Sequence, residues 1–426
     1  TGDNSRLNKL VLTYPNTYTP IHLKVLRQIA MSTFPAIREG FLRFVSESDA
    51  VAAYYVDHWS EFNPEGDIRQ KETVLVFDMG AGTLDVTLFD KFTNDEGKIE
   101  VNIKGKLGTG KAGNYLDFVL AEILSELTHT GSADVVTTKQ VPNVQILKER
   151  LELKQVIKQD LKCNLQPGNE MRYKGVTIDM DAIICHPKFL GFLNDVTSRI
   201  IDQLCQYMGR EKLAIDTVIM SGRSCKLQLL RDELAVSVAA RSTGGNHFVE
   251  FADDAQADRQ KTVVVEGAIA QASKFNTPTS QVIIKSRRLY ASYGVVYKEL
   301  GGRIKYVELL NHNNIPDAEN MVTFDSENVT AVGTSAAETL HLIQTFLSAA
   351  ETEKCYNDGN FEFISEMEEF NTEDFGRADS LNMKLRLDYN NNISLFVNGK
   401  VSRGSTPKGV DLASEITRRS IWPVTI

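Results

Sequence analysis

Strand-like apolar runs alternate with stretches of helical spacing along the first part of the chain. Strands are expected at residues 7–14, 74–89 (interrupted by a turn) and 216–224. Helices are expected after residue 20 and at residues 50–55, 114–127, 144–162, 187–208, 227–239 and 263–272. The alternation predicts an α/β region.

The pattern changes near residues 276–278, and from Leu289 onward short strands are separated by turns rich in Asn and Gly. The expected strands are 293–297, 304–310, 321–324, 341–346, 361–364, 381–387 and 393–397. They predict an all-β module, most simply a sandwich. An apolar segment, Gln281–Lys285, joins the two parts. It is either a linker that docks and undocks or a strand of one of the domains.

One turn has an unusual set of side chains. Asp78 and Asp85 flank Gly80, Ala81, Gly82 and Thr83 between two apolar runs. A plain hairpin needs only a Gly or Asn for positive φ. Glycines let backbone N–H groups approach an anion closely, and carboxylates are ligands for Mg²⁺. The turn therefore predicts a phosphate and Mg²⁺ site, with a tight hairpin carrying solvated acids as the alternative.

Composition limits the function further. The 426 residues suggest two or three domains, and the net charge of −9 argues against nucleic acid as a partner. No apolar run approaches the length of a membrane helix, so we expect no membrane partner. The five scattered cysteines contain no C-x-x-C pair. They favour a reducing compartment, the cytoplasm, over a zinc site. The chain begins at Thr1, and we expect a processed chain or, better, a fragment of a longer protein.

Several motifs agree in order and spacing with one family. They are residues 12–15 (Leu-Thr-Tyr-Pro), 46–52 (Ser-Glu-Ser-Asp-Ala-Val-Ala), 78–86 (Asp-Met-Gly-Ala-Gly-Thr-Leu-Asp-Val), 112–117 (Ala-Gly-Asn-Tyr-Leu-Asp), 218–224 (Val-Ile-Met-Ser-Gly-Arg-Ser) and 265–272 (Val-Glu-Gly-Ala-Ile-Ala-Gln-Ala). In this order the chain resembles the DnaK-type heat-shock chaperones, which belong to the actin/hexokinase-like ATPase superfamily. In the β part, residues 314–316 and 385–393 are similar to two shorter motifs of the same family.

The resemblance implies a fold and a domain order. It implies a partial actin-like (ribonuclease H-like) α/β nucleotide-binding domain at residues 1–278, with a helical insertion at 114–213. An interdomain linker at 279–288, an all-β substrate-binding sandwich at 289–403 and a tail at 404–426 would follow. The implied function is ATP-regulated binding of unfolded or extended apolar polypeptide segments, with co-chaperones as possible partners.

The resemblance also implies roles for single residues, with ATP or ADP and Mg²⁺ as cofactors. The catalytic set would be Glu47, Asp78, Thr83 and Asp85, with Asp78 and Asp85 at the metal. The nucleotide-binding set would be Gly80, Ala81, Gly82, Thr83, Gly113, Lys158, Gly222, Arg223 and Gly267. Simpler roles stay open: a helix-capping carboxylate for Glu47, local turns for Gly113 and Gly222, and a solvated helix position for Lys158.

The sequence also departs from the family pattern. An earlier phosphate loop, Asp-Leu-Gly-Thr-Thr, and a catalytic Lys are not in the chain, so we expect it to hydrolyse ATP poorly or not at all. Gln159 and Cys225 stand where the family has two Arg residues around adenine. Leu23 stands where the family has a switch Arg, and no long helical lid follows the β part. An alternative function is therefore a nucleotide-sensing or inactive interaction module. A sugar kinase or an actin-like filament protein is a third.

Overall fold

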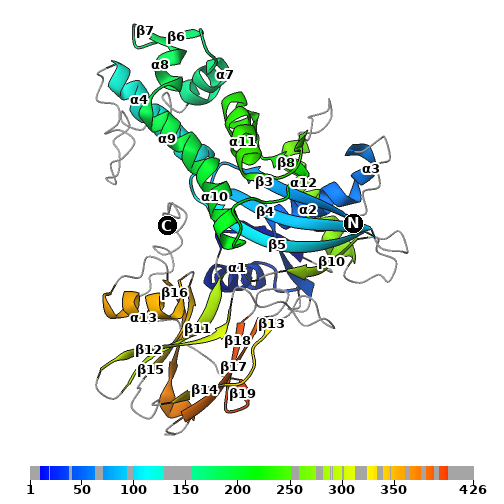
Figure 1. Ribbon diagram of the computed structural model, residues 1–426, viewed down its shortest axis with the longest axis vertical. Coiled ribbons are helices and arrows are strands. Elements are labelled where there is room, and N and C mark those ends of the chain that lie inside the picture. Colours follow the sequence, from blue (N-terminus) through cyan, green and yellow to red (C-terminus); the bar gives the residue numbers. More distant parts are fainter. Residues whose placement is uncertain are drawn as a thin grey trace, which may run out of the picture. The chain divides into compact units, whose positions relative to one another are not determined.

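The computed structural model describes residues 10–18, 20–37, 41–62, 71–93, 99–128, 155–250, 259–274, 282–287, 289, 291–299, 302–311, 324–332, 339–345, 347–359, 364–375, 380–387 and 393–401. Parts of the expected helix at 144–162 and of the strands at 321–324, 341–346 and 361–364 lie outside these residues, as do the tail at 404–426 and a short helix expected at 411–420. Figure 1 shows the helices and strands in sequence colours.

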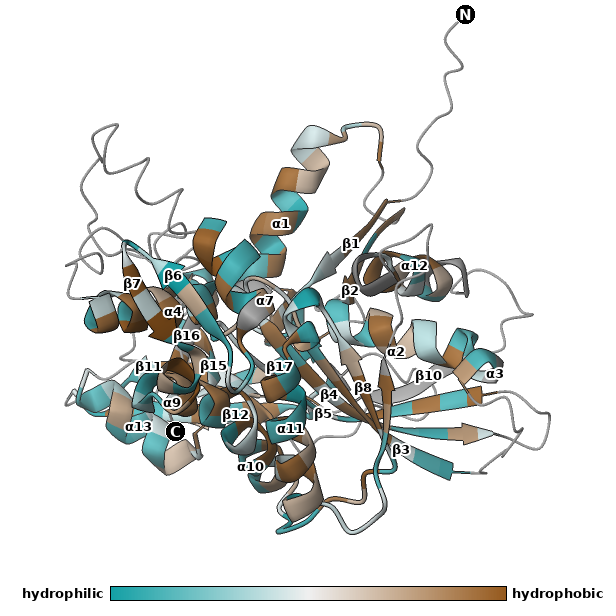
Figure 2. Ribbon diagram, turned by 90° about the horizontal axis from the view of Figure 1, so that it is seen from above, coloured by the Kyte–Doolittle hydropathy of each residue, from teal (hydrophilic) through white to brown (hydrophobic). Residues whose placement is uncertain are grey.

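The largest sheet has six strands in the order β10-β5-β4-β3-β8-β9. These strands are β3 (Lys71–Met79), β4 (Leu84–Thr93), β5 (Ile99–Thr109), β8 (Thr217–Ser221), β9 (His247–Glu250) and β10 (Val282–Arg287). Strand β3 pairs in parallel with β8, and β8 with β9. The apolar run Val74–Phe77 of β3, drawn brown in Figure 2, is completely buried. A continuous apolar run of this kind is typical of a strand covered on both faces.

The segment between the two expected domains is a strand. Strand β10 pairs in parallel with β5 at the edge of this sheet, with Val282 opposite Ile99 and Arg287 opposite Ile103. The register shifts between Ile284 and Ser286. The sequence left two interpretations open, a linker that docks and undocks or a strand of one domain. In the structure the segment is paired as a strand, and a linker docked on the edge of the sheet would be paired in the same way.

Helices accompany this sheet, and one differs from the expectation. They are α4 (Gly113–Thr128), η2 (Val156–Leu161), α7 (Lys162–Asn164), α8 (Met180–Ile184), α9 (Pro187–Val196), α10 (Ser198–Tyr207), η3 (Arg223–Lys226) and α11 (Gln228–Arg241). The single helix expected at 187–208 is broken at Thr197. The Thr197 hydroxyl donates to the carbonyl of Leu193 (2.7 Å), and such bonds bend helices. A hairpin of β6 (Glu170–Tyr173) and β7 (Val176–Asp179) precedes α8. The apolar pattern predicts a strand at 176–180, which corresponds to β7, but it predicts none at β6.

A smaller sheet holds the N-terminal strands. Strands β1 (Leu10–Tyr14) and β2 (Leu42–Ser46) pair in parallel. One buried cluster joins Tyr14 and Phe44 to α1 (Pro20–Thr33). A second cluster joins Val45 to α2 (Glu47–Asp57) and α12 (Arg259–Lys274). The short helix α3 (Trp59–Phe62) follows α2. Helices therefore cover both faces of this pair of strands.

The last part of the chain, Ser292–Val401, is called the two-sheet region below. One sheet has the order β12-β11-β15-β16, and the other β13-β17-β18-β19 with β14 beside β17. The strands are β11 (Ser292–Lys298), β12 (Ile304–Leu310), β13 (Phe324–Asp325), β14 (Val329–Val332), β15 (Thr339–Thr345), β16 (Ile364–Asn371), β17 (Ser380–Leu387), β18 (Ile393–Val397) and β19 (Lys400–Val401). A single buried cluster takes residues from both sheets, among them Val295, Leu342 and Met383.

A helix that was not expected lies in the two-sheet region. Helix α13 (Ala349–Asn357) begins with a capping box, in which the Ser348 hydroxyl accepts from the Glu351 N–H and the Glu351 carboxylate accepts from the Ser348 N–H. The pattern Ser-x-x-Glu was a usable signal for this helix. A 3₁₀ turn, η5 (Thr372–Phe375), follows β16.

The chain divides into two compact units. The first contains the residues up to Thr73, Thr87–Lys106 and the chain from Val263 through the two-sheet region; the second contains Val74–Val86 and Leu107–Thr262. These two units do not test the domain boundaries expected from the sequence, which stay a prediction. Within the described residues, no helix combines the length and the apolar character needed to span a membrane.

Candidate functional site

The turn between β3 and β4 is closed by one backbone hydrogen bond, from the N–H of Gly80 to the carbonyl of Thr83 (2.9 Å). Its tip, Ala81 and Gly82, is exposed, whereas the flanking carboxylates are buried: Asp78 is 5% and Asp85 1% exposed. A two-residue hairpin closed at 80 and 83 places residue 78 opposite residue 85. Two buried carboxylates thus face each other across adjacent strands.

Two distant segments contact this turn through its carbonyl groups. The carbonyl of Gly80 accepts from the N–H of Gly113 (3.1 Å) and from the hydroxyl of Ser224 (2.9 Å). The carbonyl of Ala81 accepts from the N–H of Asn114 (2.7 Å). The first N–H groups of α4, which have no partner within a helix, are thus bonded by the turn. Three segments that the sequence singled out separately come together in the second unit.

Glycine is required at two of these positions because the backbones are so close. A Cβ on Gly113 would lie 2.5 Å from the Ser224 hydroxyl and 3.0 Å from the Gly80 carbonyl oxygen. Gly222 has φ +84°, and a Cβ there would lie 2.3 Å from the Met79 carbonyl oxygen and 2.8 Å from Asp78 Oδ1. Both glycines also occupy local turns, as the simpler interpretation expected. The close packing is a second reason for each glycine.

Sequence reasoning missed a lysine that contacts the start of α4. Lys158 is exposed on η2. Lys162, four residues later, forms an ion pair with Asp117 and lies 3.5 Å from the carbonyl of Gly113. Residues four apart share a helix face, so the spacing of Lys158 and Lys162 was a signal that could have pointed to Lys162.

The positions expected to flank adenine differ in exposure. Arg223 is exposed on η3. Cys225 is 1% exposed, with its sulfur 3.8 Å from the carbonyl oxygen of Phe77. Gln159 is exposed, and its side-chain oxygen accepts from the Gln155 amide. Cys225 is therefore a core residue and offers no surface on which a base could stack.

Glu47 lies in the first unit, as the first residue of α2. The helix is capped by Ser46, whose hydroxyl accepts from the Asp49 N–H (3.3 Å), so the capping role falls to Ser46 and not to Glu47. Glu47 is half-buried, and this burial raises the pKa of its carboxyl group.

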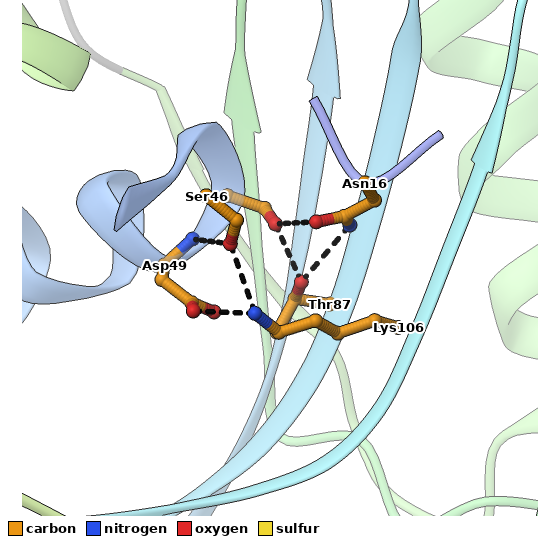
Figure 3. A network of polar contacts seen from close by, with 6 residues as sticks. Asn16, Ser46, Asp49, Thr87 and Lys106 are labelled. Carbon is orange, nitrogen blue, oxygen red and sulfur yellow. Dashed lines mark hydrogen bonds and ion pairs between the residues drawn. The ribbon is translucent and has the colours of Figure 1, made fainter. Parts of the chain in front are cut away.

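A polar network surrounds the start of α2 (Figure 3). Lys106 of β5 donates to the Ser46 hydroxyl (2.9 Å) and forms an ion pair with Asp49. A closed ring of hydrogen bonds joins the buried side chains of Asn16, Ser48 and Thr87. Hydrogen-bond networks of this kind restrict the side chains that form them. The network fixes the helix that carries Glu47.

Gly267 is buried in α12 against α2. A Cβ on Gly267 would lie 1.8 Å from the carbonyl oxygen of Ala50, so the structure gives this glycine a packing role within the first unit. Glu47 and Gly267 belong to the first unit, and Asp78, the turn, Gly113 and Gly222 to the second. A common site for all of these residues stays a prediction.

The described residues contain no group of three or more His, Cys, Asp and Glu side chains that could by itself hold a metal ion. The opposed pair Asp78 and Asp85 fits an ion such as Mg²⁺ that keeps most of its waters and takes few protein ligands. No family model matches the chain.

Proposed function

We propose that this chain is a divergent DnaK-type chaperone, in which a nucleotide at the turn of residues 80–83 controls how the two-sheet region binds extended apolar polypeptide segments. One observation carries the proposal: residues 80–83, 113–114 and 222–224 meet through direct hydrogen bonds and pack so closely at Gly113 and Gly222 that neither position has room for a Cβ. The resemblance assigns these three segments to one nucleotide site, and an isolated hairpin does not need the other two.

The chemistry of the turn suits a polyphosphate. The start of α4 is directed at the turn, and the N-terminus of a helix favours negative charge. The exposed glycine tip lets an anion approach the backbone, and Thr83 adds a hydroxyl donor. Asp78 and Asp85 would hold Mg²⁺ through its waters, which would relieve the repulsion between opposed carboxylates. When bound, Mg·ATP supplies the terminal phosphate whose presence distinguishes two states of the chain.

Strand β10 gives the nucleotide state a route to the two-sheet region. It pairs at the edge of the large sheet and directly precedes β11 in the sequence. An edge strand can leave a sheet without disrupting the inner strands. We therefore place the regulated step at the pairing of β10 with β5. The actin-like fold, the sandwich as a peptide-binding domain, a cytoplasmic location and co-chaperone partners belong to the same proposal.

A second candidate is a nucleotide-sensing or inactive interaction module. The buried Cys225 and the exposed Gln159 favour it, because neither provides the guanidinium expected beside a base. The chain also lacks a second loop of the Asp-Leu-Gly-Thr-Thr type, so we propose slow ATP hydrolysis in either case. Turnover close to that of an intact chaperone of the family would contradict this part. The two-sheet region argues against a sugar kinase or a filament protein.

The experiment follows a fluorescein-labelled apolar heptapeptide by fluorescence anisotropy during addition of Mg·ATP to the full chain. The chaperone proposal predicts that the peptide binds and that Mg·ATP changes its affinity. Val282→Pro in β10 is the matched variant: it removes a backbone donor, weakens strand pairing and should reduce the response to Mg·ATP. Peptide binding that ignores Mg·ATP would favour the inactive module, and absence of peptide binding would refute the chaperone proposal.

A further inference from the structure

Ser221 is a buried serine at the end of β8, beside the carboxylates of the candidate site. Strand β8 lies next to β3, and β3 next to β4, in the large sheet. The parallel register sets Ser221 opposite Asp78, which lies opposite Asp85 across the hairpin. Residues opposite each other on neighbouring strands have their side chains on the same face. Two carboxylates and one hydroxyl therefore form a row across three strands, all within the second unit.

The hydroxyl of Ser221 lacks the hydrogen bond that a buried hydroxyl normally makes. Ser221 is 0% exposed, and its Oγ has no hydrogen-bond partner among the described residues. By contrast, the hydroxyl of Ser224 donates to the carbonyl of Gly80 (2.9 Å). A buried hydroxyl without a partner costs free energy, and native proteins leave few such groups. Ser221 thus has a donor and an acceptor available for a ligand.

The surroundings of Ser221 leave the carboxylate end of the row as the place for that ligand. On the same face, the next side chains into the sheet are Val76 and Ile219, which are apolar and completely buried. In the other direction lies Gly222, where a Cβ would be 2.8 Å from Asp78 Oδ1, so this carboxylate reaches the backbone that follows Ser221. The carboxyl ends of parallel strands are where open α/β sheets bind ligands.

We propose that Ser221 is a third protein oxygen of the cation site at Asp78 and Asp85, and that its hydroxyl accepts a hydrogen bond from a water of the bound Mg²⁺. This inference rests on the proposed nucleotide site. Mg²⁺ keeps several of its waters in proteins, and oxygen atoms accept hydrogen bonds from them. A hydroxyl accepts such a bond without adding a third negative charge to two buried carboxylates. A water without a cation would satisfy the hydroxyl but would not neutralise the carboxylates.

The substitution Ser221→Ala tests the inference, because its two effects have opposite signs. Without ligand it removes an unpaired buried hydroxyl and nearly keeps the size of the side chain, so the midpoint of thermal unfolding of the full chain should rise by about 2 °C. In calorimetric titrations, ATP affinity without Mg²⁺ should stay as in wild type. The gain in ATP affinity that Mg²⁺ produces should shrink by about threefold or more, the equivalent of one hydrogen bond.

Tyr306→Phe is the matched control. The Tyr306 hydroxyl is also buried without a hydrogen-bond partner among the described residues, but it lies in the first unit, in a cluster with Val296 and Ile343. Its removal should raise the unfolding midpoint in the same way and leave the effect of Mg²⁺ on ATP affinity unchanged. An equal loss of the Mg²⁺ effect in both variants would contradict the inference.

Ser221→Cys gives a readout that a purely structural role of Ser221 would not change. A thiolate is a ligand for Zn²⁺, whereas Mg²⁺ prefers oxygen. With Zn²⁺ in place of Mg²⁺, the Ser221→Cys variant should bind ATP several-fold more tightly than wild type, in which the five native cysteines provide the background.

Three results would overturn the inference and leave the proposed function standing. They are a Mg²⁺ effect in Ser221→Ala equal to that of wild type, unfolding of ligand-free Ser221→Ala at a lower temperature than wild type, and equal affinity of Ser221→Cys and wild type for ATP with Zn²⁺. If wild type binds no ATP at all, the proposed function fails, and this inference fails with it.

Discussion

The turn at residues 80–83 and the core of the two-sheet region differ in how closely they are packed and in how their polar groups are bonded. Around the turn, hydrogen bonds join three segments that are distant in the sequence, and at Gly222 there is no room for even a methyl group. In the two-sheet region, Gln344 of β15 is buried with both amide atoms unpaired among the described residues. The backbones at the first site are tightly packed, whereas the second site leaves both polar atoms of a core amide without a hydrogen bond. A tightly packed site suits a small ligand of fixed shape.

The largest effect is expected from Gly222→Ala, which tests the rigidity of the turn. The new Cβ would meet the Met79 carbonyl at 2.3 Å in a backbone with φ +84°, so the turn must move. We expect a loss of about 3 kcal/mol or more in the free energy of unfolding, measured by urea denaturation, and loss of nucleotide binding.

Gly209→Ala is the control for backbone strain alone. Gly209 has φ +62°, but no atom lies within 4 Å of its Cβ position. It should cost only about 1–2 kcal/mol, the penalty of the left-handed conformation. Equal losses for the two variants would show that packing at the turn contributes nothing.

Gly113→Ala should have an intermediate effect that depends on Ser224. Its Cβ would lie 2.5 Å from the Ser224 hydroxyl, which is the end of a side chain. We expect a loss of about 1–3 kcal/mol in wild type and a smaller additional loss in the Ser224→Ala background, as measured by a double-mutant cycle in urea. Additive losses would mean that the two residues do not compete for space.

A surface ion pair in the two-sheet region should matter much less. Arg386 donates two hydrogen bonds to Asp325 (2.7 and 2.9 Å), which lowers the pKa of the Asp325 carboxyl group. A lowered pKa stabilises the fold above the unfolded pKa of about 3.9 and not below the folded value. Arg386→Gln should therefore cost at most about 1 kcal/mol at pH 7 and nothing at pH 2, by urea denaturation at each pH. A larger loss at pH 2 than at pH 7 would contradict this assignment.

The smallest effect is expected at Glu47, where removal of the charge should stabilise the fold instead of destabilising it. Burial raises the pKa of this carboxyl group, so the folded chain holds the proton more tightly and ionisation weakens the fold as pH rises through the folded pKa. Glu47→Gln should slightly raise the unfolding midpoint at pH 7.5 and leave it unchanged at pH 3.5. Destabilisation at pH 7.5 would show that the ionised carboxylate has a stabilising partner.

The sequence predicted most of the elements and the turn, because strands of apolar residues and glycine motifs carry local signals. Other features depend on long-range contacts. Alternation along Thr339–Thr345 places one polar residue, Gln344, among inward-facing apolar ones, but only the folded core shows that its amide is unpaired. The contact of Lys162 with the start of α4 likewise joins segments 49 residues apart. The break at Thr197 interrupts an otherwise regular helical pattern, at a residue whose hydroxyl bonds the carbonyl of Leu193.

The most direct test of the central claim is a calorimetric titration of the full chain with ATP in the presence and absence of Mg²⁺, for wild type and for Asp78→Asn. The account predicts saturable binding to wild type that Mg²⁺ strengthens, and a loss of this Mg²⁺ dependence in Asp78→Asn because the opposed carboxylates no longer share a cation. Absence of binding to wild type, or the same Mg²⁺ dependence in both proteins, would contradict it.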